Sequence, residues 1–289
     1  MNPGIYPNLS FADYCAIDAV NQSLLRPFIK SIRHGVYAVE NRTPPSEAMR
    51  FGTAIHTLIL DGEAAFESQY AIGGPINERT GECYGRNTKA FAEWLATQGD
   101  GREFLTTEEY ARLLAIRDRL TNHAYAGPLI QSEGAARELT IVWDEPVNGT
   151  PVRCKARIDW HHPTVGILDL KSTADADPLA FGKSVANYGY HMQAAWYLLG
   201  CERVGLAAPR YGWIAVESAA PYGVGMYALS AWEQQCGLTR AIKALRRYAD
   251  WSRGLVTPDD EDAGFTDLQI PGWSWEDEKD MEQTLKGYL

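Results

Sequence analysis

Two aspartates and two cations lie at matched distances from the centre of a short predicted loop at residues 162–166. If that loop joins two antiparallel strands, Asp159 lies opposite Asp169 and both point to the same face of the strand pair. The same register places Arg157 opposite Lys171 on that face, because side chains alternate along a strand. The other face then carries four apolar side chains, Ile158, Trp160, Leu168 and Leu170. The pattern predicts one apolar face and one face with two carboxylates flanked by cations.

The two opposed carboxylates need a compensating positive charge, since like charges directly opposite each other destabilise a strand pair. One interpretation is a cross-strand ion-pair cluster in which Arg157 and Lys171 neutralise Asp159 and Asp169. The other is a hard divalent cation, Mg²⁺ or Mn²⁺, held by carboxylate oxygens together with water and a substrate phosphate. The spacing of these residues alone leaves both interpretations open.

The order of these residues resembles the signature of the PD-(D/E)xK nucleases, with Asp159 on one strand and Asp169, Leu170 and Lys171 on the next. Ile158 stands where that signature has proline, which makes the short motif less specific. Two further blocks, one on each side of the motif, make the resemblance specific.

Upstream, Gly52 and His56 in FGTAIHTLIL are similar to the G-x-x-x-H helix of RecB-type nucleases. Downstream, Gln193 and Tyr197 are similar to the Q-x-x-x-Y element of the same group. The order and spacing of the three blocks most resemble the RecE-type exodeoxyribonuclease domain of phages and prophages, within the RecB-like and lambda-exonuclease-like group. The resemblance extends from about residue 14 to about residue 255.

The resemblance implies a metal site and a set of catalytic residues. Asp159, Asp169 and the carbonyl of Leu170 would hold Mg²⁺, with Mn²⁺ able to substitute, and His56 would lie beside the metal. Lys171 would orient the attacking water or stabilise the developing negative charge. By resemblance, the catalytic set also includes Glu138, Gln193 and Tyr197.

These residues also have plain structural interpretations. A lone histidine on an apolar helix, such as His56, is more often a core residue, and Glu138 could be a solvated residue of an edge strand. Tyr190, Gln193 and Tyr197 fall on one helical face, which is typical of core packing. Gln193 would then need buried hydrogen-bond partners.

The resemblance implies a metal-dependent exonuclease that degrades linear double-stranded DNA from its 5′ ends. The 3′ single strand left behind would serve a single-strand annealing protein in recombination, and similar enzymes assemble into homo-oligomeric rings. One alternative is another PD-(D/E)xK nuclease, RecB-like or endonucleolytic. Another is a non-catalytic DNA-binding or assembly protein that keeps the fold, and a third is an unrelated acidic protein with an ion-paired hairpin.

The elements that must position these residues predict an α/β fold, and the resemblance implies a PD-(D/E)xK restriction-endonuclease-like core. A mixed central β-sheet at about residues 138–228 would be flanked by helices from both halves of a single exonuclease domain, residues 1–255. The cleft between the sheet and the His56 helix would hold the carboxylates. Besides the two strands around the 162–166 loop, the alternation predicts strands at 138–143, 211–216 and 223–228. Apolar periodicity and caps predict helices at 46–60, 88–97, 106–123, 177–187, 188–200 and 229–255.

The composition of the chain limits which classes of protein are possible. The chain has 289 residues, 45% of them apolar, and a net charge of −10, which counts against nucleic-acid binding because phosphates attract Lys and Arg. Much of the acidic excess falls in the predicted tail at 256–289, and a bound metal adds positive charge. The sequence has no apolar run long enough for a membrane span and no secretion signal, and its cysteines lack C-x-x-C spacing. We therefore expect a cytoplasmic protein that binds no membrane.

Overall fold

In the computed structural model, six strands form one sheet in the order β1-β4-β5-β6-β7-β8. The structure describes residues 1–41, 43–98, 101–261, 268, 269, 272 and 286. Strands β6 and β7 pair in parallel and the other neighbours pair antiparallel, so the predicted mixed sheet is confirmed. The strands are β1 (Gly4–Tyr6), β4 (Ala136–Val147), β5 (Thr150–His162), β6 (Gly166–Thr173), β7 (Tyr211–Glu217) and β8 (Val224–Ala228). Strand β1 was not predicted, and it extends the sheet at its β4 edge.

Helices form at all the predicted positions, and most begin at a side-chain cap. Thr106 and Glu109 make a capping box, in which each side chain accepts a hydrogen bond from the other's backbone N–H. The helices are α1 (Phe11–Ala16), α2 (Gln22–Leu25), α3 (Ile32–Glu40), α4 (Glu47–His56), α5 (Glu63–Gln69), α6 (Lys89–Thr97), α7 (Thr107–Thr121), α8 (Ala126–Ile130), α9 (Pro178–Tyr188), α10 (Tyr190–Arg203) and α11 (Ala231–Ser252). A small parallel pair, β2 (Tyr70–Ile72) with β3 (Glu103–Leu105), stands apart from the main sheet.

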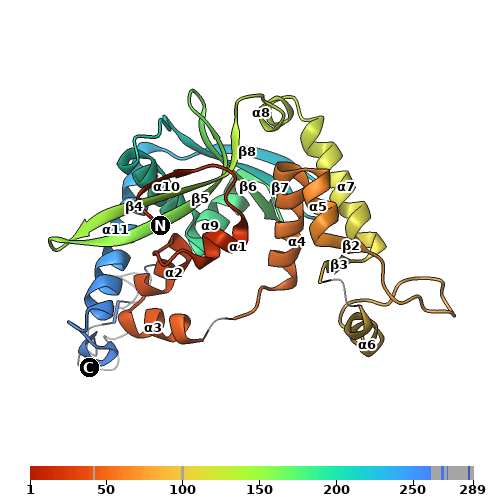
Figure 1. The fold of residues 1–289 in the computed structure, drawn as a ribbon, viewed down its shortest axis with the longest axis horizontal. Coiled ribbons are helices and arrows are strands. Elements are labelled where there is room, and N and C mark those ends of the chain that lie inside the picture. The colour runs from red at the N-terminus through yellow and green to blue at the C-terminus, as the bar shows by residue number, and fades with distance from the viewer. Residues whose placement is uncertain (42, 99–100, 262–267, 270–271, 273–285, 287–289) are drawn as a thin grey trace.

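The sheet has a different helical layer on each face (Figure 1). On one face, α10 and α11 pack over a core that includes Trp143 and Trp196, whose ring centroids lie 4.9 Å apart. On the other face, α4 and α7 pack over a second core that includes Leu170 and Ile214. The helix with His56 and the helix with Gln193 therefore approach the sheet from opposite sides.

The N-terminal segment pairs with β4 through β1, and several of its carbonyls are also held by three alternate cations of β5. Arg153 donates to the carbonyl of Met1, and Arg157 donates to that of Leu9 at 2.7 Å. The buried ammonium of Lys155 donates to the carbonyls of Tyr14 and Ile17, both at 2.8 Å. Alternate residues of a strand share one face, so these cations attach residues 1–17 to the β5 face that also carries Asp159.

The expected acidic tail at 256–289 lies mostly outside the described residues. Residues 258–261 form a short 3₁₀ turn, and Asp259 makes an ion pair with Arg33 at 2.7 Å. The acidic run at 276–282 lies outside the described residues, and the domain boundary at residue 255 stays a prediction. Within the described part of the chain, no helix has the length and apolar character needed to span a membrane.

A close approach of α11 to α10 sets the position of the Gln193 helix. A Cβ on Gly237 would lie 2.1 Å from the carbonyl oxygen of His191, so only glycine fits there. The carbonyl belongs to the backbone and cannot rotate away, which makes this contact a constraint on where α10 lies.

We predict that Gly237→Ala lowers the melting temperature, because overpacking costs about 1–3 kcal/mol and each kcal/mol corresponds to about 2–4 °C. Thermal unfolding followed by circular dichroism measures the change. Gly182→Ala in α9 is the matched control, because nothing lies within 4 Å of its added Cβ. Alanine is the better helix former there, so the control should be neutral or slightly stabilised. Equal melting temperatures for the two variants would contradict the α10–α11 constraint.

Candidate active site

The predicted register of the β5–β6 hairpin is confirmed for three pairs, and the ladder ends where the aspartates begin. Trp160 pairs with Leu168, His161 with Ile167, and His162 with Gly166, so the loop is shorter than predicted by one residue at each end. Asp159 and Asp169 do not continue the ladder. Instead, Asp159 Oδ2 accepts a hydrogen bond from the backbone N–H of Leu170 at 3.1 Å. The strands thus separate at the two carboxylates.

The prediction of one shared apolar face for the hairpin is wrong. Ile158 belongs to the core beneath α10, whereas Leu168 and Leu170 pack on the opposite side, toward α4 and α7. The backbone explains the change of face. The pair Glu138–Asp159 is missing from the β4–β5 ladder, and Glu138 has a φ of 51°, in the left-handed region. Such a conformation is unfavourable for a residue with a side chain and is often found at functional sites.

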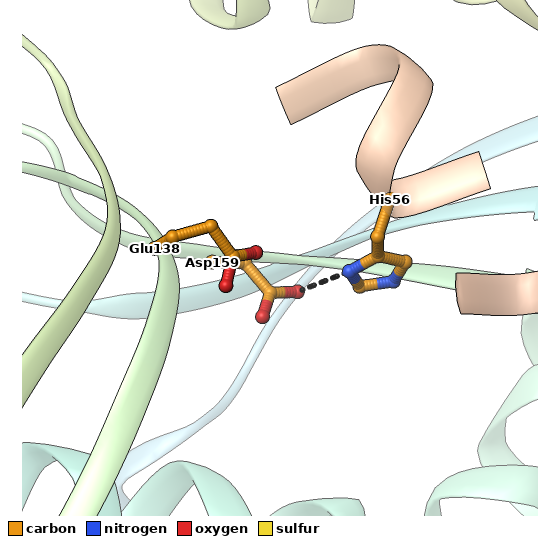
Figure 2. A group of neighbouring side chains, drawn as sticks. All are labelled: His56, Glu138 and Asp159. Atoms are coloured by element: carbon orange, nitrogen blue, oxygen red, sulfur yellow. Dashed lines mark ion pairs between the residues drawn. The ribbon is translucent and has the colours of Figure 1, made fainter. Parts of the chain in front are cut away.

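His56, Glu138 and Asp159 form a cluster at this distortion (Figure 2). One potential ligand atom from each residue lies within 4.8 Å of the other two. The Nδ1 atom of His56 lies 3.4 Å from Oδ2 of Asp159, and both side chains are partly buried. The interpretation of His56 as a plain core residue therefore does not describe its surroundings.

Local helix geometry brings His56 to the sheet. It is the last residue of α4, and the next turn, Thr57–Asp61, widens into a π-helix. Single π-helical turns are frequent at functional sites. One turn earlier, a Cβ on Gly52 would lie 3.1 Å from Oγ of Ser172 on β6, so glycine lets α4 pack closely against that strand.

A second group surrounds Asp169, whose side chain is fully buried. Lys171 Nζ lies 2.5 Å from Oδ2 of Asp169. Gln193 Nε2 on α10 donates to Oδ1 of Asp169 at 3.1 Å and to the Tyr197 hydroxyl at 3.2 Å. Gln193 thus has the partners that a buried amide needs.

The peptide of Leu170 connects the two groups. Its N–H points toward Asp159 on β5. In an extended strand the N–H and C=O of one residue point to the same edge. The Leu170 carbonyl therefore also faces the gap where β5 and β6 separate, as a metal ligand from this position would have to.

The cations near the two aspartates pair differently from the prediction. Lys171 pairs with Asp169, as the ion-pair interpretation requires. Arg157 pairs with Glu138 instead of facing Lys171. Within the described part of the chain, His56 is the only basic side chain with a nitrogen within 4.0 Å of the Asp159 carboxylate.

The pKa shifts follow from this arrangement. Burial, and then the charge of Asp169, raise the pKa of Asp159 to about 8. Burial, and then the charge of Asp159, raise the pKa of Glu138 to about 7. Burial, and then the charge of Lys171, lower the pKa of His56, so its imidazole is neutral at physiological pH. The cluster therefore combines a neutral imidazole with two carboxylates whose ionised forms are unfavourable unless a further cation is bound.

This donor set fits a divalent metal ion. Carboxylate oxygens suit Mg²⁺ and Mn²⁺, and a neutral imidazole nitrogen suits the transition metals. Asp159, Glu138 and His56 are all partly accessible, whereas the carboxylate of Asp169 is held inside by Lys171 and Gln193.

One feature of the site had no signal in the sequence, and a second had a signal that was not recognised as part of the site. The Arg157–Glu138 ion pair depends on the left-handed backbone of Glu138, which no propensity predicts. The ring of Tyr190 lies against the ammonium of Lys171, with 4.9 Å between Nζ and the ring centroid. The helical period placed Tyr190 on the face of Gln193 and Tyr197, and that face could have identified it.

The chain matches a family of known domains, and its fold is similar to that of a solved structure. A family model described as "PDDEXK-like domain of unknown function (DUF3799)" matches residues 21–267. No protein with a curated description matches the chain. A crystal structure from Eubacterium rectale, described as that of a "Putative exonuclease", has a TM-score of 0.60 and 13% identity, covering 92% of this chain and 98% of its own. The structure of SSO0001 has a TM-score of 0.27 and 14% identity, covering 38% of this chain and 49% of its own.

We predict that Mn²⁺ or Mg²⁺ raises the melting temperature of the metal-free protein, and more at pH 8 than at pH 5.5. The pKa of Asp159 rises on folding from 3.8 to about 8, so the repulsion that a cation relieves grows as the pH rises through that interval. At low pH the folded protein keeps the proton, which competes with the metal. Differential scanning calorimetry with and without metal measures the shift. An equal shift at both pH values would argue against binding at these carboxylates.

We predict that Asp159→Asn stabilises the metal-free protein at pH 8 and abolishes the response to metal. The amide removes a buried negative charge near Asp169 but keeps an oxygen that can accept from the Leu170 N–H. The gain should be a few degrees in melting temperature. Asp118→Asn is the control, because that side chain is 63% exposed and surface changes stay within about 0.5 kcal/mol. A destabilised Asp159→Asn variant would mean that the carboxylate is already satisfied without metal.

Proposed function

The chain belongs to the PDDEXK-like family described as a domain of unknown function (DUF3799), and from this premise we propose that it is a metal-dependent DNA nuclease. The observation that carries the proposal is the gap between β5 and β6. There the cluster of His56, Glu138 and Asp159 meets the Lys171–Asp169 pair. A phosphodiester bound in that gap would have metal ligands on one side and a cation on the other.

The proposed metal ligands are His56, Glu138, Asp159 and the carbonyl of Leu170, with Asp169 closing the site from the β6 side. A divalent cation bound there would polarise the scissile phosphate and lower the pKa of a water molecule. Mg²⁺ is the expected ion, and the imidazole makes Mn²⁺ an effective substitute.

In this proposal Lys171 acts as a positive charge and does not accept a proton as a base. Burial lowers its pKa, but the charges of Asp169 and Asp159 outweigh burial and leave the pKa above its ordinary value. Lys171 is therefore an ammonium at neutral pH. It would donate a hydrogen bond to a phosphate oxygen and stabilise the charge that develops there.

Asp169, Gln193 and Tyr197 would hold Lys171 and the phosphate in position. Asp169 orients the ammonium of Lys171, and Gln193 fixes the second oxygen of Asp169. The Tyr197 hydroxyl supports Gln193, and burial raises the pKa of Tyr197 well above its ordinary value, so it stays neutral. The three residues form a hydrogen-bonded support on α10 and β6 that positions Lys171 in advance of the reaction.

For the finer activity we propose a 5′-to-3′ exonuclease acting on linear double-stranded DNA. The RecE-like order of the three motif blocks supports this, and a structural neighbour described as a "Putative exonuclease" supports the exonuclease class alone. The product would be a 3′ single-stranded tail for an annealing partner, and we expect a homo-oligomeric ring that keeps the enzyme on its substrate.

Digestion of a linear duplex labelled separately at its 5′ and 3′ ends, beside a closed circular duplex, tests this function. We expect early release of the 5′ label with Mg²⁺, an intact circle, and no cleavage in EDTA. Early release of the 3′ label would show that digestion runs in the opposite direction, from 3′ to 5′. Cutting of the circle would indicate an endonuclease, and no cleavage with Mg²⁺ or Mn²⁺ would overturn the proposed nuclease.

We predict that Lys171→Met and Asp169→Asn each lower the cleavage rate at least about 100-fold, because each removes charge stabilisation at the phosphate or its support. Initial rates on the end-labelled duplex measure the loss. Lys89→Met on α6 is the control, since that lysine is 89% exposed and pairs only with its helical neighbour Glu93 among the described residues. Normal cleavage by either site variant would contradict the assignment, provided that circular dichroism shows a folded protein.

A further inference from the structure

We propose that Tyr188, Tyr190 and Arg26 form a stacking site for an unpaired nucleobase beside Lys171. The identity of the ligand rests on the proposed nuclease function. The three residues come from two distant parts of the chain, α9–α10 and the turn after α2, and together they continue the site outward from the catalytic lysine.

The three side chains make a continuous series that begins at Lys171. The ammonium of Lys171 lies 4.9 Å from the centroid of the Tyr190 ring. That ring lies 5.6 Å from the Tyr188 ring at an interplanar angle of 30°. The guanidinium of Arg26 follows, 5.9 Å from the Tyr188 centroid. The series runs from the catalytic lysine to an aromatic ring and a planar cation, the two groups on which nucleobases stack.

The outer two groups of the series are exposed and the inner ring is not. Tyr190 is only partly exposed, and its ring also packs near Phe181, with 6.3 Å between centroids. Tyr188 is 52% exposed although it is a large aromatic residue. Arg26 is exposed, so the inner ring is fixed while the outer ring and the guanidinium are accessible to a ligand.

The backbone holds this arrangement. Gly189, with φ 71°, joins α9 to α10, and the helices change direction between the two tyrosines. A Cβ on Gly189 would lie 3.9 Å from Cδ of Arg26, so the turn after α2 packs directly against this joint. Arg26 donates a hydrogen bond to the carbonyl of Asn187 at 3.3 Å, which keeps its guanidinium beside Tyr188.

The charge of Arg26 favours a nucleic-acid ligand. Among the described residues it pairs with no carboxylate and only donates to a backbone carbonyl. An exposed, unneutralised arginine is notable in a chain with a net charge of −10. It adds an attraction for the phosphates next to a stacked base.

The geometry further indicates which base is bound. Lys171 would contact the scissile phosphate, so a base on Tyr188 belongs to a nucleotide close to that phosphate on the same strand. A base inside a duplex is already stacked and paired and cannot lie on Tyr188. The site therefore selects a strand end that has separated from its complement.

Fluorescence titration with a single-stranded oligonucleotide carrying 2-aminopurine at its 5′ end tests the inference. The full-length protein is used in EDTA at low salt, which prevents metal-dependent cleavage. We expect saturable quenching with the wild type, since stacking on an aromatic ring quenches this base. Tyr188→Leu should weaken binding about 5- to 100-fold, because it keeps apolar bulk but loses the ring. Tyr188→Phe should bind within about twofold of the wild type.

Tyr125→Leu is the matched control and should bind like the wild type. Tyr125 is 74% exposed at the start of α8, an element well separated from α2 in Figure 1. Arg26→Gln should weaken binding and reduce its salt dependence. No quenching by the wild type, or equal binding by Tyr188→Leu and Tyr188→Phe, would overturn the stacking site.

Cleavage assays separate this inference from the proposed function. If the wild type degrades DNA but Tyr188→Leu does not change binding, the nuclease stands and the stacking site is wrong. If the quenching follows the Tyr188 variants but no metal supports cleavage, the stacking site stands and the nuclease is wrong. If both are right, Tyr188→Leu should raise KM for duplex with a frayed 5′ end at least as much as for blunt-ended duplex, because the frayed end presents the unpaired base that loses its stacking partner.

Discussion

The structure depends on keeping two carboxylates close together inside protein, where water cannot screen their repulsion. Asp169 is neutralised by Lys171 and fixed by Gln193, and its side chain is fully buried. Among the described residues, Asp159 receives only the Leu170 N–H and a neutral imidazole, so its repulsion is left for a metal to relieve. The separation of the strands, the helix on each face and the left-handed backbone of Glu138 together give the carboxylates of Asp159 and Asp169 these different surroundings.

The sequence predicts best what depends on neighbouring residues. The hairpin register follows from side-chain alternation and the position of a loop, both local properties, and three backbone pairs agree with it. The mixed sheet and its helical layers followed from the same alternation and periodicity together with the family resemblance. The single apolar face of the hairpin was wrong because alternation assumes regular backbone, and Glu138 breaks that regularity. The partner of Arg157 was missed for the same reason.

The N-terminal segment shows what a family comparison leaves out. The family model begins at residue 21, yet the carbonyl of Leu9 accepts from Arg157, which in turn pairs with Glu138. A segment outside the matched region therefore supports a side chain of the candidate metal cluster. No pattern in the first 20 residues predicts this, because the contact joins positions 148 residues apart.

The parallel pairing of β6 with β7 has a consequence for how the protein is made. Parallel neighbours need a long crossover connection, and here α9 and α10 form that connection. The helix that holds Gln193 against Asp169 is thus part of the chain that must fold over before β7 can join the sheet. A nascent polypeptide that ends after β6 carries both aspartates and the lysine, but it has neither the supporting helix nor the strand beside them. The candidate site can therefore be complete only after synthesis has passed residue 217.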